Sequence, residues 1–207
     1  MSEYNTRSLQ AVGLSCSRDD RLLFDGLNFE LTPGQVLLLE GRNGSGKTSL
    51  LRILCGFREA DAGQVLWCGD SIKNAQYYAD MAYVGHLDGI KKELTVQENL
   101  MVSLALSRPG VYSIEQALAK VRLSGYEDVL VQSLSAGQKR RLSLARLLIT
   151  DNHLWILDEP FTSLDKEGIA LIETLMIEHC MNGGMIVLTS HHDLDLHSAP
   201  VQRIHLS

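Results

Sequence analysis

The sequence lacks the features of a secreted, membrane-spanning or disulfide-bonded protein. Its N-terminus, MSEYNTRSLQ, has no apolar core of a secretory signal. Its longest apolar runs, such as residues 36–39, are far too short to cross a bilayer. The four cysteines are scattered and form no CxxC pair, which argues against a disulfide framework or a zinc cluster. We therefore expect a protein that is soluble by itself and works in a reducing cytosol.

An excess of positive charge is also missing. The formal net charge is −6 at pH 7, which argues against a general affinity for nucleic acid but leaves a local basic patch open. There are no internal repeats and no low-complexity segments. With 207 residues, 45% of them hydrophobic, the chain is long enough to bury the core of one domain.

Short apolar runs recur along the chain, of the kind that is buried on both faces of a parallel sheet. They lie at residues 34–40 (GQVLLLE), 153–158 (HLWILD) and 185–189 (MIVLT), and helical patterns separate them. Buried strands that alternate with helices predict an α/β fold with a mainly parallel core sheet.

Other regions differ from this pattern. Residues 9–31 and 63–72 read as short alternating strands, which predicts an antiparallel sheet at one edge. The stretch 87–133 is mainly helical and has no buried-strand run, so we expect an inserted helical subdomain there. The expected organisation is a single domain over residues 1–207, in which residues 1–86 and 134–207 form the α/β core and the antiparallel sheet.

A glycine-rich segment lies between the first buried run and a helical pattern. Residues 41–48, GRNGSGKT, match GxxxxGK[ST] in full and in the strand–loop–helix context that the motif requires. Glycines let the backbone wrap a phosphate, and the helix N-terminus adds its positive end. Lys47 would supply charge to the β- and γ-phosphates, and the Thr48 hydroxyl would bind Mg²⁺. A glycine-rich loop that serves only as a turn does not need Lys47 and Thr48 at the start of the following helix. The expected phosphate-binding residues are Gly41, Arg42, Asn43, Gly44, Ser45, Gly46, Lys47 and Thr48.

Two carboxylates, Asp158 and Glu159, end the second buried run. Ligands of open parallel sheets bind at the carboxyl ends of the strands, so these side chains should lie at the same edge as the phosphate loop. We expect Asp158 to hold Mg²⁺ through water, and Glu159 to orient or deprotonate the attacking water. Two acidic residues after a strand can also simply cap the next helix, but the phosphate loop favours catalysis.

The segment LSAGQ, residues 134–138, precedes a further helix. Ser135 and Gln138 fit a capping box, which is a sufficient structural reason for both. A capping box does not require Gly137, however, and glycine permits close backbone approach. A helix N-terminus with a serine hydroxyl is a second anion site. One nucleotide does not need two such helix ends, so the sequence predicts a dimer in which each subunit completes the site of the other.

The segments GRNGSGKT, LSAGQ and LWILDEP, followed by Ser163-Leu164-Asp165 and Ser190-His191, occur in the order and spacing of ABC-type ATPase subunits. The chain resembles these subunits over essentially its whole length. The resemblance implies a P-loop NTPase fold and a head-to-tail homodimer with two ATP molecules between the phosphate loop of one subunit and the LSAGQ segment of the other. It places Asp165 across the interface. It also places His191, rather than the adjacent His192, against the γ-phosphate in support of Glu159.

Two positions depart from the usual ABC pattern. His86 stands where these subunits usually have a glutamine that reaches Mg²⁺ and the attacking water. A neutral imidazole can bind the metal or the water; the alternative is a solvated loop residue. Arg18 stands where an aromatic side chain usually stacks on adenine, and a planar guanidinium can also stack on a base.

These departures, together with the string GH-x-x-GIK-x-ELT-x-x-ENL at residues 85–100, resemble the ATP-binding subunit of the bacterial cytochrome c maturation system. That resemblance implies a peripheral subunit on the cytoplasmic face of the inner membrane, bound to the integral membrane subunits of the system. Whether heme is transported or ATP powers the release of a heme-loaded chaperone stays open. No CxxCH motif is present, and we expect no direct heme binding. The alternatives are an ABC ATPase for another substrate and a soluble ABC protein that acts on ribosomes or DNA.

Overall fold

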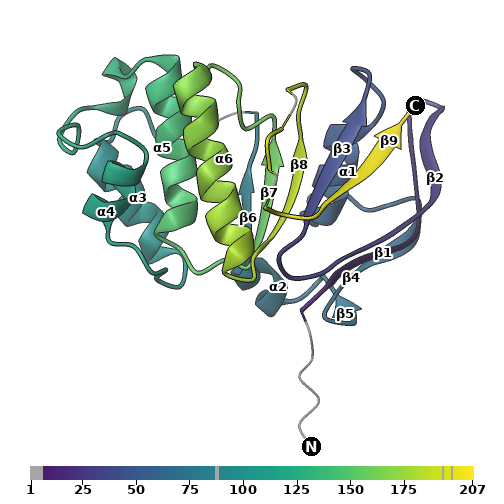
Figure 1. Ribbon diagram of the computed structural model, residues 1–207. Coiled ribbons are helices and arrows are strands. Elements are labelled where there is room, and N and C mark those ends of the chain that lie inside the picture. The colour runs from purple at the N-terminus through teal and green to yellow at the C-terminus, as the bar shows by residue number, and fades with distance from the viewer. Residues whose placement is uncertain (1–6, 87–88, 193, 197) are drawn as a thin grey trace, which may run out of the picture.

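Five strands pair in parallel to form the core sheet of the chain, in the order β6-β7-β8-β3-β9 (Figure 1). This arrangement comes from a computed structural model that describes residues 7–86, 89–192, 194–196 and 198–207. The strands are β3 (Val36–Gly41), β6 (Met81–Val84), β7 (Leu154–Asp158), β8 (Met185–Thr189) and β9 (Val201–Leu206). The three apolar runs that predict core strands form β3, β7 and β8. The fifth strand, β9, was not expected from the sequence.

The central strands are buried on both faces, and alternate residues of β3 show how. Val36 and Leu38 belong to one hydrophobic cluster, whereas Leu37 and Leu39 belong to the other. Successive side chains of a strand point to opposite faces of the sheet, so each face has its own core. This is why these strands read as continuous apolar runs.

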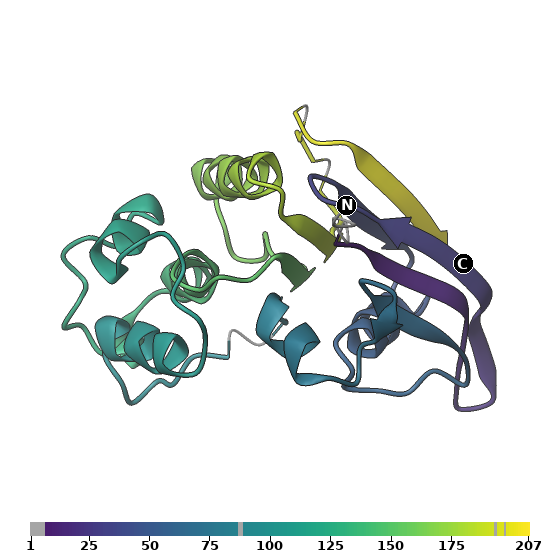
Figure 2. The same cartoon turned by 90° about the horizontal axis from the view of Figure 1, so that it is seen from below.

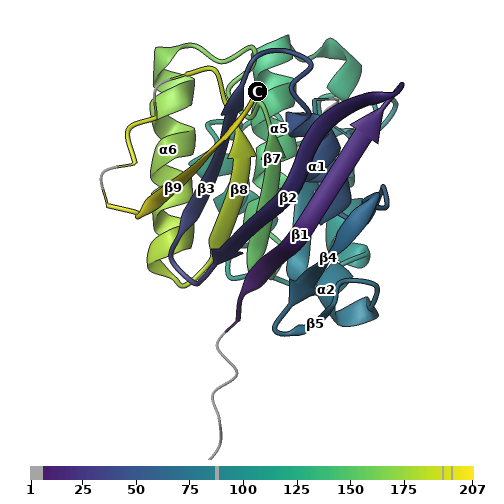
Figure 3. The same ribbon diagram turned by 90° about the vertical axis from the view of Figure 1, so that its right-hand side faces the viewer.

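On one face of the core sheet lies an antiparallel sheet in the order β2-β1-β4-β5, as predicted. Its strands are β1 (Leu9–Arg18), β2 (Arg21–Leu31), β4 (Ala62–Trp67) and β5 (Asp70–Ser71). Helix α1 (Lys47–Leu54) shares one hydrophobic cluster with this sheet and with the core strands. Figure 3 shows β1 and β2 in front of α1 and the core sheet. Helix α1, which follows the phosphate loop, is thereby held between the two sheets.

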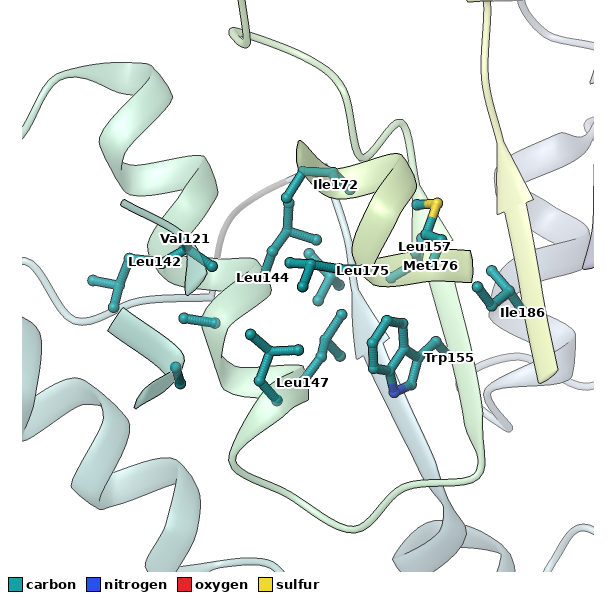
Figure 4. Packing of buried hydrophobic residues seen from close by; sticks show 14 of the residues in the cluster. Val121, Leu142, Leu144, Leu147, Trp155, Leu157, Ile172, Leu175, Met176 and Ile186 are labelled. Atoms are coloured by element: carbon teal, nitrogen blue, oxygen red, sulfur yellow. The ribbon is translucent and has the colours of Figure 1, made fainter. Parts of the chain in front are cut away.

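The other face of the core sheet is covered by α5 (Ala136–Leu148) and α6 (Lys166–Met181). Leu144 and Leu147 of α5 pack with Ile172 and Leu175 of α6 in the cluster that also contains Trp155 of β7 (Figure 4). Both helices begin at a predicted site segment: α5 begins within LSAGQ, and α6 begins directly after Asp165. Their packing therefore sets the position of those segments.

The segment predicted as helical forms α3 (Val96–Ala105), α4 (Ile114–Lys120) and the 3₁₀ turn η1 (Val131–Ser133). Helices α3 and α4 each begin with a capping box, which fixes their first turns. They lie beside α5, at the opposite end of the molecule from the antiparallel sheet (Figure 2). A short helix that the sequence did not suggest, α2 (Ala75–Asp80), precedes β6. None of the helices in the described ranges combines the length and apolar character that crossing a membrane requires.

Candidate active site

The carboxyl ends of β3, β7 and β8 meet at one edge of the core sheet, and each is followed by predicted site residues. A cavity of about 550 Å³ opens at this edge, where open parallel sheets bind their ligands. From the phosphate loop and the start of α1 it is lined by Asn43, Gly44, Gly46, Lys47 and Thr48. From four other segments it is lined by Arg18, His86, Asp158, Glu159 and His191.

The phosphate loop is wound so tightly that its glycines are required. Gly41 has a φ of 141°, and a Cβ there would lie 2.2 Å from the carbonyl oxygen of Leu206. Lys47 Nζ turns back into the loop and donates to the carbonyl oxygens of Gly41, at 2.6 Å, and Arg42, at 3.2 Å. The Ser45 hydroxyl is buried without a partner among the described residues. A buried ammonium group and an unpaired buried hydroxyl are the donors that a bound phosphate would use, so these residues fit a nucleotide.

Oxygen ligands for a divalent cation meet beside this loop. The Thr48 hydroxyl lies 3.2 Å from Asp158 Oδ2, and the other carboxylate oxygen, Oδ1, accepts a hydrogen bond from Thr189 at 2.8 Å. Hydroxyl and carboxylate oxygens are the donors that Mg²⁺ prefers, so Thr48 and Asp158 fit this ion. The carboxylate also affects its neighbour Tyr83: burial raises the pKa of Tyr83 to about 12, and the charge of Asp158 adds to the rise.

Glu159 has a strained backbone. Its φ is 51°, in the left-handed region where a residue other than glycine costs about 1–3 kcal/mol and persists only if its surroundings hold it. Its N–H donates to Thr189 Oγ1 at 2.9 Å. Thr189 therefore holds both adjacent carboxylate residues, one through the side chain and one through the backbone.

Of the two adjacent histidines after β8, His191 is the one beside Glu159. Its Nε2 lies 3.4 Å from Glu159 Oε1. The ring of His192 instead meets Phe161 edge-on, with 6.1 Å between centroids, and its backbone N–H donates to Ser190 Oγ. His191 is thus the histidine of this pair that lies beside the Glu159 carboxylate, and its contact with the γ-phosphate stays a prediction.

The two unusual residues, His86 and Arg18, reach the same cavity from different strands. His86 follows the end of β6 and is exposed. Arg18 ends β1, where its guanidinium lies 3.4 Å from the Asp19 carboxylate and remains 69% exposed. Neither side chain is locked by the surrounding protein core, so both are accessible to a molecule in the cavity.

The remaining predicted residues do not line this cavity within the described part of a single chain. Ser135 and Gln138 form the full capping box of α5, at 3.2 and 2.8 Å. Asp165 caps α6 by accepting from the Gly168 N–H at 2.8 Å. A Cβ on Gly137 would lie 2.9 Å from the Ser163 carbonyl oxygen. These contacts give Ser135, Gln138, Asp165 and Gly137 local structural roles, and their nucleotide contacts stay a prediction.

Two residues of the site were missed by the sequence analysis. Thr189 is the polar end of a buried run, which is a weak signal. Arg140 is 3% exposed and donates to the carbonyl oxygens of Asp158 and Glu159. It precedes the buried Leu144 by four residues, so helical periodicity places it on the buried face of α5.

The geometry agrees with the comparisons to known proteins. Residues 24–162 match the family described as "ABC transporter". The "Cytochrome c biogenesis ATP-binding export protein CcmA" of Methylococcus capsulatus is 53% identical, covering 91% of this chain and 93% of that protein. The protein of the same name from Photobacterium profundum is 46% identical, covering 96% and 99%. The chain belongs to the CcmA family of ABC transporter ATP-binding proteins.

CcmA-family proteins are ATPases coupled to transport, so the assignment to an ABC ATPase subunit is confirmed. As such a subunit, the chain binds nucleotide and works with membrane partners. The P-loop fold of the ABC type is also confirmed. A solved "Putative ABC transporter (ATP-binding protein)" from Pyrococcus furiosus matches with a TM-score of 0.83 at 21% identity, covering 96% of this chain and 97% of that chain.

Proposed function

We propose that this chain hydrolyses Mg·ATP in the cavity at the carboxyl edge of the core sheet and thereby energises a membrane complex for cytochrome c biogenesis. One observation carries the proposal: Lys47, Thr48, Asp158, Glu159 and His191, from three separate segments, line one cavity. The names of the curated relatives support the biological setting.

Each of these residues has a distinct role in the proposal. Lys47 and the loop amides hold the β- and γ-phosphates, while Thr48 and Asp158 hold Mg²⁺, which when bound neutralises the charge on those oxygens. Glu159 accepts a proton from the attacking water, or orients it. His191, 3.4 Å from the Glu159 carboxylate, supports that carboxylate and contacts the γ-phosphate.

His86 and Arg18 complete the proposed site. His86 takes the place of the glutamine that links an ABC site to its helical subdomain, because it leaves β6 towards α3 and lines the cavity. Arg18 stacks its guanidinium on the nucleotide base, a contact that a planar cation can make without an aromatic ring.

The active form in this proposal is a head-to-tail homodimer. Ser135, Gly137, Gln138 and Asp165 do not line the described cavity of their own chain, yet Ser135 and Asp165 are exposed. The N-terminus of a helix and its serine hydroxyl form an anion site. Each subunit would present this site to the γ-phosphate of ATP bound by its partner.

The membrane subunits would dock beside the helical subdomain. A second cavity, of about 310 Å³, lies between α3 and β6 and includes Met81, Val102 and Leu106. Leu106 is 83% exposed and Met101 is 53% exposed, and the proposal assigns these apolar side chains to the docking surface. The proposal therefore places the chain at the cytoplasmic face of the inner membrane, with heme handled by its partners.

The test uses the full chain co-purified with its membrane partners. Glu159→Gln removes the base and should lower ATP turnover at least about 10²-fold, while Mg·ATP still drives dimerisation. The matched control is Glu167→Gln, an exposed glutamate on α6, which should hydrolyse ATP at the wild-type rate. The proposal fails if Glu159→Gln retains full turnover. The homodimer fails if this variant stays monomeric when saturated with Mg·ATP.

A further inference from the structure

Arg140 of α5 is a buried cation that, among the residues the structure describes, donates to four backbone carbonyl oxygens from two other parts of the chain. Its Nε donates to Pro160 at 3.0 Å, and its Nη2 donates to Asp158 at 3.0 Å and to Glu159 at 2.6 Å. Its Nη1 donates to Gly85 at 2.8 Å. A guanidinium that is 3% exposed needs such partners, because burying a charge without hydrogen bonds is costly. Charge-assisted hydrogen bonds are also about twice as strong as neutral ones.

Three of these carbonyls belong to the consecutive residues Asp158, Glu159 and Pro160, with the strained Glu159 in the centre. Thr189 holds the N–H side of Glu159, and Arg140 holds its carbonyl side. A left-handed backbone at a residue other than glycine persists only when neighbours fix it in this way. Arg140 therefore helps to set the direction in which the Glu159 side chain leaves the backbone.

The fourth carbonyl, that of Gly85, directly precedes His86. The planar fork of one guanidinium thus fixes the end of β7 and the end of β6 relative to each other. A lysine could not do this equally well, since its ammonium is a single point from which the bonds diverge. The backbone of Glu159 and that of Gly85, the residue before His86, are therefore both bonded to the same guanidinium.

Arg140 also belongs to the first turns of the helix that begins with Ser135. We infer that Arg140 is a positioning residue, which aligns Glu159 and His86 of its own chain and ties both to the helix that meets the nucleotide of the partner chain. The inference rests on the proposed function and deepens it. Any shift of α5 when the partner's nucleotide binds is transmitted through this guanidinium to the chain's own catalytic carboxylate.

The next residue on the helix provides a matched control. Arg141 donates at 3.4 Å to the carbonyl oxygens of Val121 and Arg122, in the turn at the end of α4. The two arginines are adjacent and chemically identical, but they bind carbonyl oxygens in different parts of the molecule. If turnover falls when Arg140 is replaced but not when Arg141 is replaced, the cause is the loss of the bonds to the carbonyls of Gly85 and residues 158–160. The loss of one positive charge from α5 is common to both variants and cannot be the cause.

The experiment measures ATP turnover, KM for ATP and the thermal unfolding midpoint of the full chain co-purified with its membrane partners. Arg140→Gln should lower kcat about 10- to 100-fold, since a misplacement of about 1 Å can cost 10²-fold. KM should change less than about threefold because the phosphate loop is untouched. Arg140→Lys should be intermediate, and Arg141→Gln should remain near the wild-type rate. In a protein that already carries Glu159→Gln, adding Arg140→Gln should lower kcat by less than about a further threefold. The reason is that Arg140 acts through the carboxylate that this protein lacks.

The outcomes separate this inference from the proposed function. If the wild-type complex does not hydrolyse ATP, the proposed function fails. If it does and Arg140→Gln matches Arg141→Gln, the inference alone is overturned. The inference is also overturned if Arg140→Gln lowers kcat by the same factor in the wild type and in Glu159→Gln, since that indicates a general structural role. Should Arg140→Gln fail to fold, Arg140→Lys carries the same comparison, and wild-type kcat for that variant contradicts the inference.

Discussion

The hydroxyl of Thr48 donates a hydrogen bond to the carboxylate of Asp158 at 3.2 Å, although the two residues are 110 positions apart in the sequence. Thr48 belongs to the first turn of α1, and Asp158 ends β7. Because β3 and β7 are parallel strands of one sheet, their following segments meet at the same edge. The two proposed Mg²⁺ ligands are thus held together by the fold itself.

Thr48→Val tests the metal role of this pair. Removing a hydroxyl that serves a charged group costs about 1.5–3 kcal/mol, which corresponds to roughly a 10- to 150-fold rise in the Mg²⁺ concentration needed for half-maximal hydrolysis. Thr48→Ser keeps the hydroxyl and should need little more Mg²⁺ than the wild type. The measurement is ATP turnover against Mg²⁺ concentration. Identical titrations for the valine and serine variants would contradict the assignment.

The adjacent histidines provide a second test. His191→Ala removes the ring beside the Glu159 carboxylate and should lower ATP turnover about 10- to 100-fold, the range typical of a lost positioning group. His192→Ala removes the ring that meets Phe161 and should change turnover less than about threefold. Steady-state ATP hydrolysis by both variants shows which of the two histidines supports turnover. The larger loss in His192→Ala would reverse the assignment.

The role of His86 is tested by substitution with glutamine, the residue that ABC subunits usually have at this position. His86→Gln restores the usual ABC side chain and should keep turnover within about threefold of the wild type, whereas His86→Ala should lower it about tenfold or more. The same hydrolysis assay measures both. Wild-type turnover in His86→Ala would show that the side chain is a solvated loop residue, the alternative already considered.

The sequence alone was sufficient for the parts of the fold that depend on local patterns. Strands buried on both faces read as continuous apolar runs, as at residues 185–189 in β8. The phosphate loop was found because its motif occurs between a strand and a helix. The antiparallel sheet was found from alternating strands and turns. In each case the determining residues are neighbours in the sequence.

The parts that were missed depend on contacts between distant segments. Strand β9 has only one buried residue, Leu206, so it shows no buried run although it pairs with β3 along its length. Arg140 reaches Gly85 across 55 residues and Asp158 across 18. A capping box also looks the same whether or not its serine contacts a nucleotide. Local patterns cannot show any of these relationships.

A prediction for stability concerns His179 of α6, which lies away from the nucleotide cavity. Its ring stacks on Trp155 of β7, with 3.8 Å between centroids and an interplanar angle of 10°. Burial lowers the pKa of His179 from 6.5 to about 4. Between these values the unfolded chain takes up a proton that the folded chain does not, so the free energy of unfolding falls as the pH is lowered.

The matched variant is His179→Phe, which keeps a flat ring in the stack and cannot titrate. Between pH 7 and pH 5 the wild type should lose about 2 kcal/mol more of its free energy of unfolding than this variant, because one pKa unit corresponds to about 1.4 kcal/mol. Urea unfolding of both proteins at the two pH values measures the difference. Parallel losses would mean that His179 titrates equally in both states and that its burial does not suppress protonation.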